Sequence, residues 1–221
     1  KEFIFKIFKL KQKYLYLLIT LFFFIIAYHH LSSGFRMSSD SNKFSSFADN
    51  LIKFNFDLYD FFFTLPIFLI ALCKILFVDN WQYIFLLLNL TLVFFSMIIF
   101  AKTLLIIGVR SSLILITLPL ILISVDMLTW PRYILSDMNY AFLVILITYF
   151  MAKGLVEDKF NYLAIFLTLF LILITRPTSI SVIFAIIFFI TISKQLFFLK
   201  PRMILLFTLI LFILVPLIFG I

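Results

Sequence analysis

The amino-acid sequence predicts an all-α fold, a polytopic bundle of transmembrane helices. Hydrophobic residues make up 65% of the 221 residues, charged residues make up 13%, and the mean hydropathy is +1.25. A soluble domain is nearer half apolar and a quarter charged, because its surface needs polar side chains. Four Gly and six Pro exclude disorder and collagen-like repeats. The single cysteine, Cys73, excludes a disulfide framework.

The chain begins with a basic segment, residues 1–13, which contains five lysines. The apolar stretch 14–31 follows, and it is longer than the apolar core of a signal peptide and lacks a small-residue cleavage site. We therefore expect a retained signal anchor in a cell-membrane protein, with the N-terminus in the cytoplasm. The net charge of +8 does not indicate a nucleic-acid partner, because the basic residues collect beside the apolar stretches.

Seven further apolar stretches follow, and a bilayer core takes about 20 helical residues to cross. They cover residues 61–78, 81–101, 111–128, 131–152, 160–175, 177–193 and 203–221. If 61–78 does not cross, 12 of the 18 Lys and Arg lie in the cytoplasm and 6 lie outside. If it crosses, with Lys74 inside the span, the numbers become 7 and 10. Basic residues concentrate on the cytoplasmic side of membrane proteins, so the first arrangement is favoured and we expect about seven spans. Residues 61–78 are then a juxtamembrane helix. The alternative for this segment is an ordinary short span.

Residues 32–80 form the first external loop in this topology. Ser38 to Ser41 are candidate N-cap residues. After them, apolar residues recur at helical spacing and predict an amphipathic helix that lies on the membrane; they are Phe44, Phe47, Ala48, Leu51 and Ile52. Asp40 is expected at the N-terminus of this helix, either as a reactive carboxylate or as a simple cap. Asp137 is expected on the same outer face.

The segment Asp40-Ser41-Asn42-Lys43-Phe44, followed by the small residue Ala48, resembles the first-loop signature of GT-C glycosyltransferases. Protein O-mannosyltransferases and lipid A aminoarabinose transferases belong to this group. Their pattern is commonly Asp-Glu-x-x-Tyr, so a serine and a phenylalanine here replace the second acid and the tyrosine. Leu65-Pro66 resembles the second juxtamembrane helix of the family, Asp137 its second external acid, and Thr175-Arg176-Pro177 a further element. The resemblance covers about residues 14–190.

The resemblance implies an inverting transferase that moves a sugar from a polyprenyl-phosphate carrier to an acceptor glycan, lipid or protein at the outer face of the membrane. One carboxylate accepts the proton of the acceptor, and cations stabilise the phosphate that leaves. Asp40 is the expected general base, and Asp137 assists it, orients the acceptor or holds a cation. Lys43, Arg132 and Arg176 are the candidate phosphate-binding residues. For Arg132, which follows Trp130-Pro131, a structural anchor at the membrane interface is the default interpretation.

Two further features bear on cofactors. His29 and His30 lie at the end of the first span, near Asp40. Imidazole and carboxylate suit divalent cations, so a site for a divalent cation is one possible interpretation. Adjacent histidines point in different directions on a helix, however, and an interfacial role is the main interpretation. Separately from any cofactor, Asp126 is a candidate functional residue, because ionisable groups at the edge of lipid are often functional. Its alternative role is an ion pair with Arg132. No other cofactor is indicated.

The competing function is a membrane transporter or flippase for a lipid or small solute. Transporters place charged or broken segments near mid-membrane, often in duplicated halves. Here the charges lie at span ends and the halves show no duplication, which favours the enzyme. A catalytically silent remnant or assembly subunit is a third hypothesis. We expect one GT-C-like domain over residues 14–221, truncated at its C-terminus, because GT-C enzymes usually continue with more spans and an acceptor-recognition region.

Overall fold

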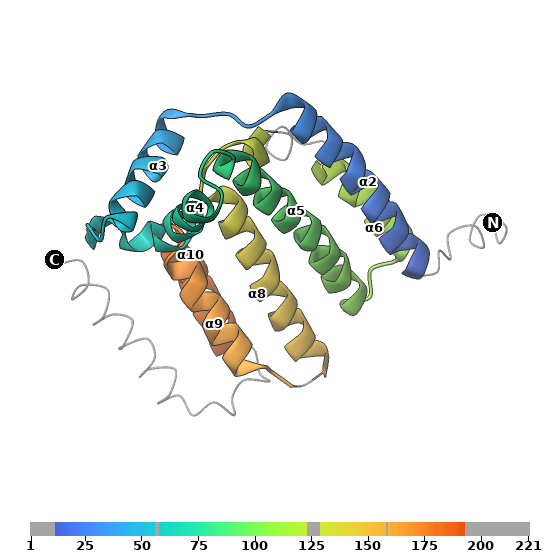
Figure 1. Cartoon of the computed structure of the whole chain (residues 1–221). Helices are drawn as coiled ribbons and strands as arrows, with labels where there is room; N and C mark the ends of the chain where they lie inside the picture. Colours follow the sequence, from blue (N-terminus) through green and yellow to red (C-terminus); the bar gives the residue numbers. More distant parts are fainter. Residues whose placement is uncertain (1–11, 56–57, 123–128, 158, 193–221) are drawn as a thin grey trace.

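The computed structural model describes residues 12–55, 58–122, 129–157 and 159–192 (Figure 1). Within these ranges the chain is helical and forms no extended strand, which confirms the all-α fold class. The elements are α2 (Gln12–Ser33), α3 (Ser39–Ile52), the 3-10 helix η1 (Leu58–Phe63), α4 (Thr64–Leu76), α5 (Trp81–Ile106), α6 (Ser111–Leu122), the 3-10 helix η2 (Trp130–Arg132), α8 (Asp137–Glu157), α9 (Tyr162–Leu173) and α10 (Ser179–Ile192).

Three of these helices are long and apolar enough to cross a membrane. They are residues 14–33 of α2, all of α5 and all of α8. Two shorter apolar helices cover residues 61–76 and 162–173. Three such helices are compatible with a location in the membrane, whereas the number of about seven spans and the cytoplasmic N-terminus stay predictions. The stretch 203–221 lies outside the described residues.

The helices α5, α8 and α9 lie side by side and run from upper left to lower right in Figure 1. The helix α4 is seen nearly end on, so its axis crosses theirs. With 13 residues, α4 is about 20 Å long, which is shorter than a bilayer core of about 30 Å. Its one charged residue, Lys74, points to α3, where its ammonium donates to the backbone oxygen of Ser45 at 2.9 Å, to the Ser45 hydroxyl at 2.8 Å and to Asp49 at 2.7 Å. This length is compatible with a juxtamembrane helix, and the position of α4 relative to the membrane stays a prediction.

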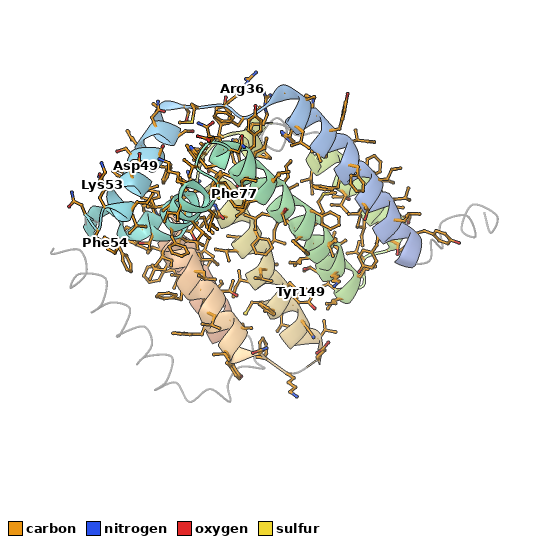
Figure 2. All side chains as sticks on the ribbon, viewed as in Figure 1. Arg36, Asp49, Lys53, Phe54, Phe77 and Tyr149 are labelled. Carbon is orange, nitrogen blue, oxygen red and sulfur yellow. The ribbon has the colours of Figure 1, made fainter. Side chains whose placement is uncertain are left out.

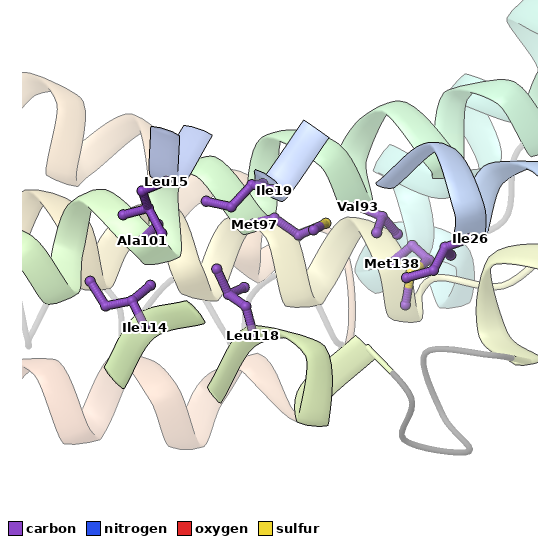
Figure 3. Packing of buried hydrophobic residues seen from close by; sticks show 9 residues of the cluster. All are labelled: Leu15, Ile19, Ile26, Val93, Met97, Ala101, Ile114, Leu118 and Met138. Carbon is purple, nitrogen blue, oxygen red and sulfur yellow. The ribbon is translucent and has the colours of Figure 1, made fainter. Parts of the chain in front are cut away.

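Buried apolar side chains join the helices in three main clusters. Figure 3 shows the cluster between α2, α5, α6 and α8, with Leu15, Ile19 and Ile26 from α2; Val93, Met97 and Ala101 from α5; Ile114 and Leu118 from α6; and Met138 from α8. A second cluster joins α3, α4 and α5 through Phe44, Ala48, Ile67, Ile70, Ala71, Cys73 and Phe85, with Ile134. A third joins α8, α9 and α10. The second cluster matters most for function, because it attaches α3 to the end of the bundle.

The apolar stretch 131–152 begins before the helix that it contains. Pro131 lies in the short helix η2, and α8 begins only at Asp137. Between them Tyr133 is extended and forms a β-bridge with Arg36. The buried amide of Asn89, on α5, donates to the carbonyl oxygens of Pro131 at 3.1 Å and Tyr133 at 3.3 Å. These bonds satisfy the carbonyl oxygens of Pro131 and Tyr133 outside α8, so the apolar stretch starts six residues before that helix.

Candidate functional site

A pocket of about 280 Å³ lies where the N-terminal turns of α3 and α8 meet the loop after α9. Charged residues from all three segments line it: Asp40 and Lys43 from α3, Asp137 from α8, and Arg176 from the loop. Its remaining lining is mostly apolar and consists of Phe44, Phe47, Phe63 and Leu135, with Ser136. The structure therefore brings together four of the five site residues chosen from the sequence, including both carboxylates.

The first carboxylate, Asp40, lies in the first turn of α3. The N-cap is Ser38, whose hydroxyl accepts from the backbone N–H of Ser41 at 3.1 Å. The interpretation of Asp40 as the helix cap is therefore wrong. Its side chain is 63% exposed and lies 3.5 Å from the ammonium of Lys43, which is 68% exposed. An ion pair this exposed is weak, so the Asp40 carboxylate can exchange its partner for a ligand.

The second carboxylate, Asp137, begins α8 and is 14% exposed. It forms an ion pair with the guanidinium of Arg176, which is 38% exposed. The backbone around Arg176 is held on both sides. Its carbonyl oxygen accepts from the Ser179 N–H at 3.0 Å, and Ile174 accepts from the N–H of Leu65 at the start of α4. Arg176 is thus fixed by Asp137 while part of its guanidinium stays open to the pocket.

Arg132 does not line this pocket. Its guanidinium is buried and donates from Nε to the carbonyl oxygen of Gly34 at 2.8 Å and from Nη2 to that of Ser33 at 2.7 Å. Burial lowers the pKa of Arg132, and the nearby charge of Arg36 lowers it further. The contacts join the end of α2 to η2, which matches the structural anchor that was the default interpretation. They leave the predicted contact of Arg132 with a lipid phosphate without geometric support.

The candidate metal ligands do not form a cluster. Within the ranges that the structure describes, no group of three or more His, Cys, Asp or Glu side chains could hold a metal ion. The rings of His29 and His30 lie 5.7 Å apart, and that of His30 is buried. Asp126, predicted as a functional residue or as a partner of Arg132, lies outside the described residues.

Two parts of the site were missed by sequence reasoning. Phe63 forms an edge-to-face contact with Phe44 at 5.2 Å between ring centres, and both side chains line the pocket. In a chain with 33 phenylalanines no pattern distinguishes it. Asn89 supports the loop before Asp137 from within an apolar helix. It could have been found, because a buried polar residue in a membrane-length helix usually has a partner.

Comparison with known proteins adds no relative: no family model, no curated protein and no solved structure matches this chain. The pocket and the residues that line it are therefore the features from which a function can be inferred.

Proposed function

We propose that this protein is an integral-membrane glycosyltransferase of the GT-C type, which moves a sugar from a polyprenyl-phosphate carrier to an acceptor at one face of the membrane. The observation that carries the proposal is the meeting of Asp40, Lys43, Asp137 and Arg176 in one pocket at the end of the bundle. These residues are up to 136 positions apart in the chain (from 40 to 176), so only the packing of the helices brings them into one pocket.

The chemistry needs one free carboxylate and at least one cation. Asp40 accepts the proton of the acceptor hydroxyl while the acceptor oxygen attacks the anomeric carbon. The bond from that carbon to the phosphate oxygen breaks, and the polyprenyl phosphate leaves as an anion. No general acid is needed for this leaving group, because a cation stabilises its charge.

The two carboxylates have different surroundings, and these suggest different roles. Asp40 is exposed and only loosely paired, which suits a base that must release and accept a proton. Asp137 is nearly buried and paired with Arg176, which suits a group that orients this guanidinium toward the phosphate. Lys43 is the second cation within reach of the same pocket. The apolar lining suits the isoprenoid part of the carrier.

The proposal is tested by incubating membranes that contain the protein with radiolabelled polyprenyl-phosphate sugars and following the release of the carrier phosphate. We expect Asp40→Asn to abolish transfer and carrier release. The matched control is Asp79→Asn, an exposed acid that does not line the pocket and whose loss should leave transfer unchanged. Arg176→Gln should weaken donor binding strongly, and Arg36→Gln, an exposed arginine elsewhere, should not.

Full transfer by Asp40→Asn would remove the proposed base. If the wild-type protein releases no carrier from any lipid-linked sugar but supports counterflow of a solute in proteoliposomes, the protein is a transporter and the enzyme proposal fails.

A further inference from the structure

The helix α3 ends in a conformation that normally requires glycine. The N–H of Asn55 donates to the Asn50 oxygen at 2.9 Å, and the N–H of Phe54 donates to the Leu51 oxygen at 3.0 Å. This pair of bonds is the Schellman motif, and the residue that turns the chain in it adopts a left-handed backbone. Here that residue is Phe54, with φ 58°. Among the described residues other than glycine, no second one has a positive φ.

The side chain of Phe54 gains nothing inside the protein that would offset this strain. It is 97% exposed, and Figure 2 shows it with Lys53 at the margin of the molecule, away from the helical bundle. A bulky residue in the left-handed region is an outlier, and glycine would form the same turn without the clash of Cβ. The packing of the described residues therefore does not explain a phenylalanine at this position, whereas a partner outside the chain would.

The surroundings of α3 indicate that lipid is the outside partner. Three helices have the length and composition to cross a bilayer, and α3 and α4 lie at one end of them (Figure 1). The outward side chains of α4 form an apolar stripe with helical spacing, Phe68, Leu72, Ile75 and Leu76, all of them exposed. A helix that faces water presents polar side chains instead. The helix α4, on which α3 packs, thus has the surface of an element within the membrane interface.

Lys53 and Phe54 together have the composition of an interfacial anchor. Aromatic rings settle near the boundary between headgroups and acyl chains, and a lysine beside them extends its ammonium to the lipid phosphates. Both side chains are exposed and adjacent at the end of α3.

We propose that Lys53 and Phe54 anchor the C-terminal end of α3 in the membrane surface, with the ring of Phe54 inserted among the lipids. The opposite end of α3 carries Asp40 and Lys43, so the anchor fixes the orientation of one wall of the pocket. This inference stands on backbone geometry and exposure, and it does not depend on what the pocket binds.

The first test measures how deeply position 54 lies in the lipid bilayer. The full chain with Phe54→Cys, in a Cys73→Ala background, is spin-labelled and placed in nanodiscs that contain anionic lipid. We expect the label at 54 to collide more often with oxygen, which concentrates in lipid, than with a water-soluble nickel complex. The matched control is Ser46→Cys, an exposed polar position on α3, where the order should reverse. A label at 54 that is as accessible to nickel as the control, or shielded from both reagents, would overturn the proposal, because Phe54 would then lie in water or against protein.

The second test uses glycine, which separates anchoring from the shape of the turn. Phe54→Gly relieves the backbone strain, so a purely local role predicts that amide hydrogen exchange across 42–52 slows or stays the same. An anchor predicts the opposite change in nanodiscs. The amide exchange rate in α3 becomes several-fold faster, because the helix no longer has the Phe54 ring inserted among the lipids. Slower or equal exchange would refute the anchor.

Discussion

Replacing Lys74 with methionine tests how α3 is held against α4. The ammonium makes three hydrogen bonds to Ser45 and Asp49, and it lies 4.9 Å from the centre of the Trp81 ring. A hydrogen bond to a charged group contributes about 1.5–3 kcal/mol, but the bond to the half-exposed Asp49 is screened and contributes about 0.2–1 kcal/mol. Methionine keeps the apolar contacts of the stem and avoids the desolvation of the ammonium, which offsets part of the loss.

From these terms we expect Lys74→Met to weaken the docking of α3 on α4 by about 2 kcal/mol. Local opening exposes the amides of α3 to exchange, so their exchange rates should rise about thirtyfold, since about 1.4 kcal/mol corresponds to a factor of ten. Hydrogen exchange followed by mass spectrometry of peptides from residues 39–52 measures this directly. The amides of α8 should be unaffected, because the bonds of Lys74 do not reach that helix.

Two variants on α3 serve as controls for this experiment. Asp49→Asn keeps a side-chain oxygen that accepts from Lys74 and removes only a screened charge, so exchange should rise much less. Ser46→Ala changes an exposed neighbour and should have no effect. If Lys74→Met leaves exchange in α3 unchanged, the three bonds do not hold the helix, and the explanation given for the charged residue in α4 fails.

Two further changes test packing contacts outside the pocket. Arg132→Met removes both hydrogen bonds to the carbonyl oxygens of Ser33 and Gly34 and should lower the free energy of unfolding by about 2–4 kcal/mol. Thermal unfolding in detergent measures this change. An unchanged unfolding midpoint would contradict the role of Arg132 as a structural anchor. Gly154→Ala places a Cβ 2.3 Å from a ring carbon of Phe160 and should cost about 1–3 kcal/mol in the same assay. Adding Phe160→Leu should restore part of this loss, and no rescue would mean that the ring is not the obstacle.

The sequence predicted the features that depend on local composition and periodicity. The membrane class follows from the apolar fraction, and the stretches 14–31 and 81–101 correspond to α2 and α5 within a few residues. The amphipathic helix after Asn42 is also confirmed, with Phe44 and Ala48 on its buried face. Each of these is a property of neighbouring residues, so no knowledge of distant contacts was needed.

The candidate site was predicted only in part. A resemblance pointed to Asp40 and Asp137 separately, and the charge count placed both on one face of the membrane. Neither the resemblance nor the charge count predicted that Arg176 pairs with Asp137. Neither predicted that Arg132 instead holds the turn at Gly34. All the arginines near span ends look alike in sequence, and only the packing of the helices decides which of them reaches the pocket.

Composition and hydrophobic period by themselves determined that this chain is helical and suited to lipid, because the cost of exposing apolar or charged groups is set residue by residue. Tertiary structure alone decided that Arg176 reaches the pocket whereas Arg132 holds the turn at Gly34. The buried amide of Asn89 holds the carbonyl oxygens of Pro131 and Tyr133 outside α8, and the ends of α3, α8 and α9 converge through the packing of their apolar faces. These outcomes depend on contacts between segments far apart in the chain, which a one-dimensional pattern does not contain.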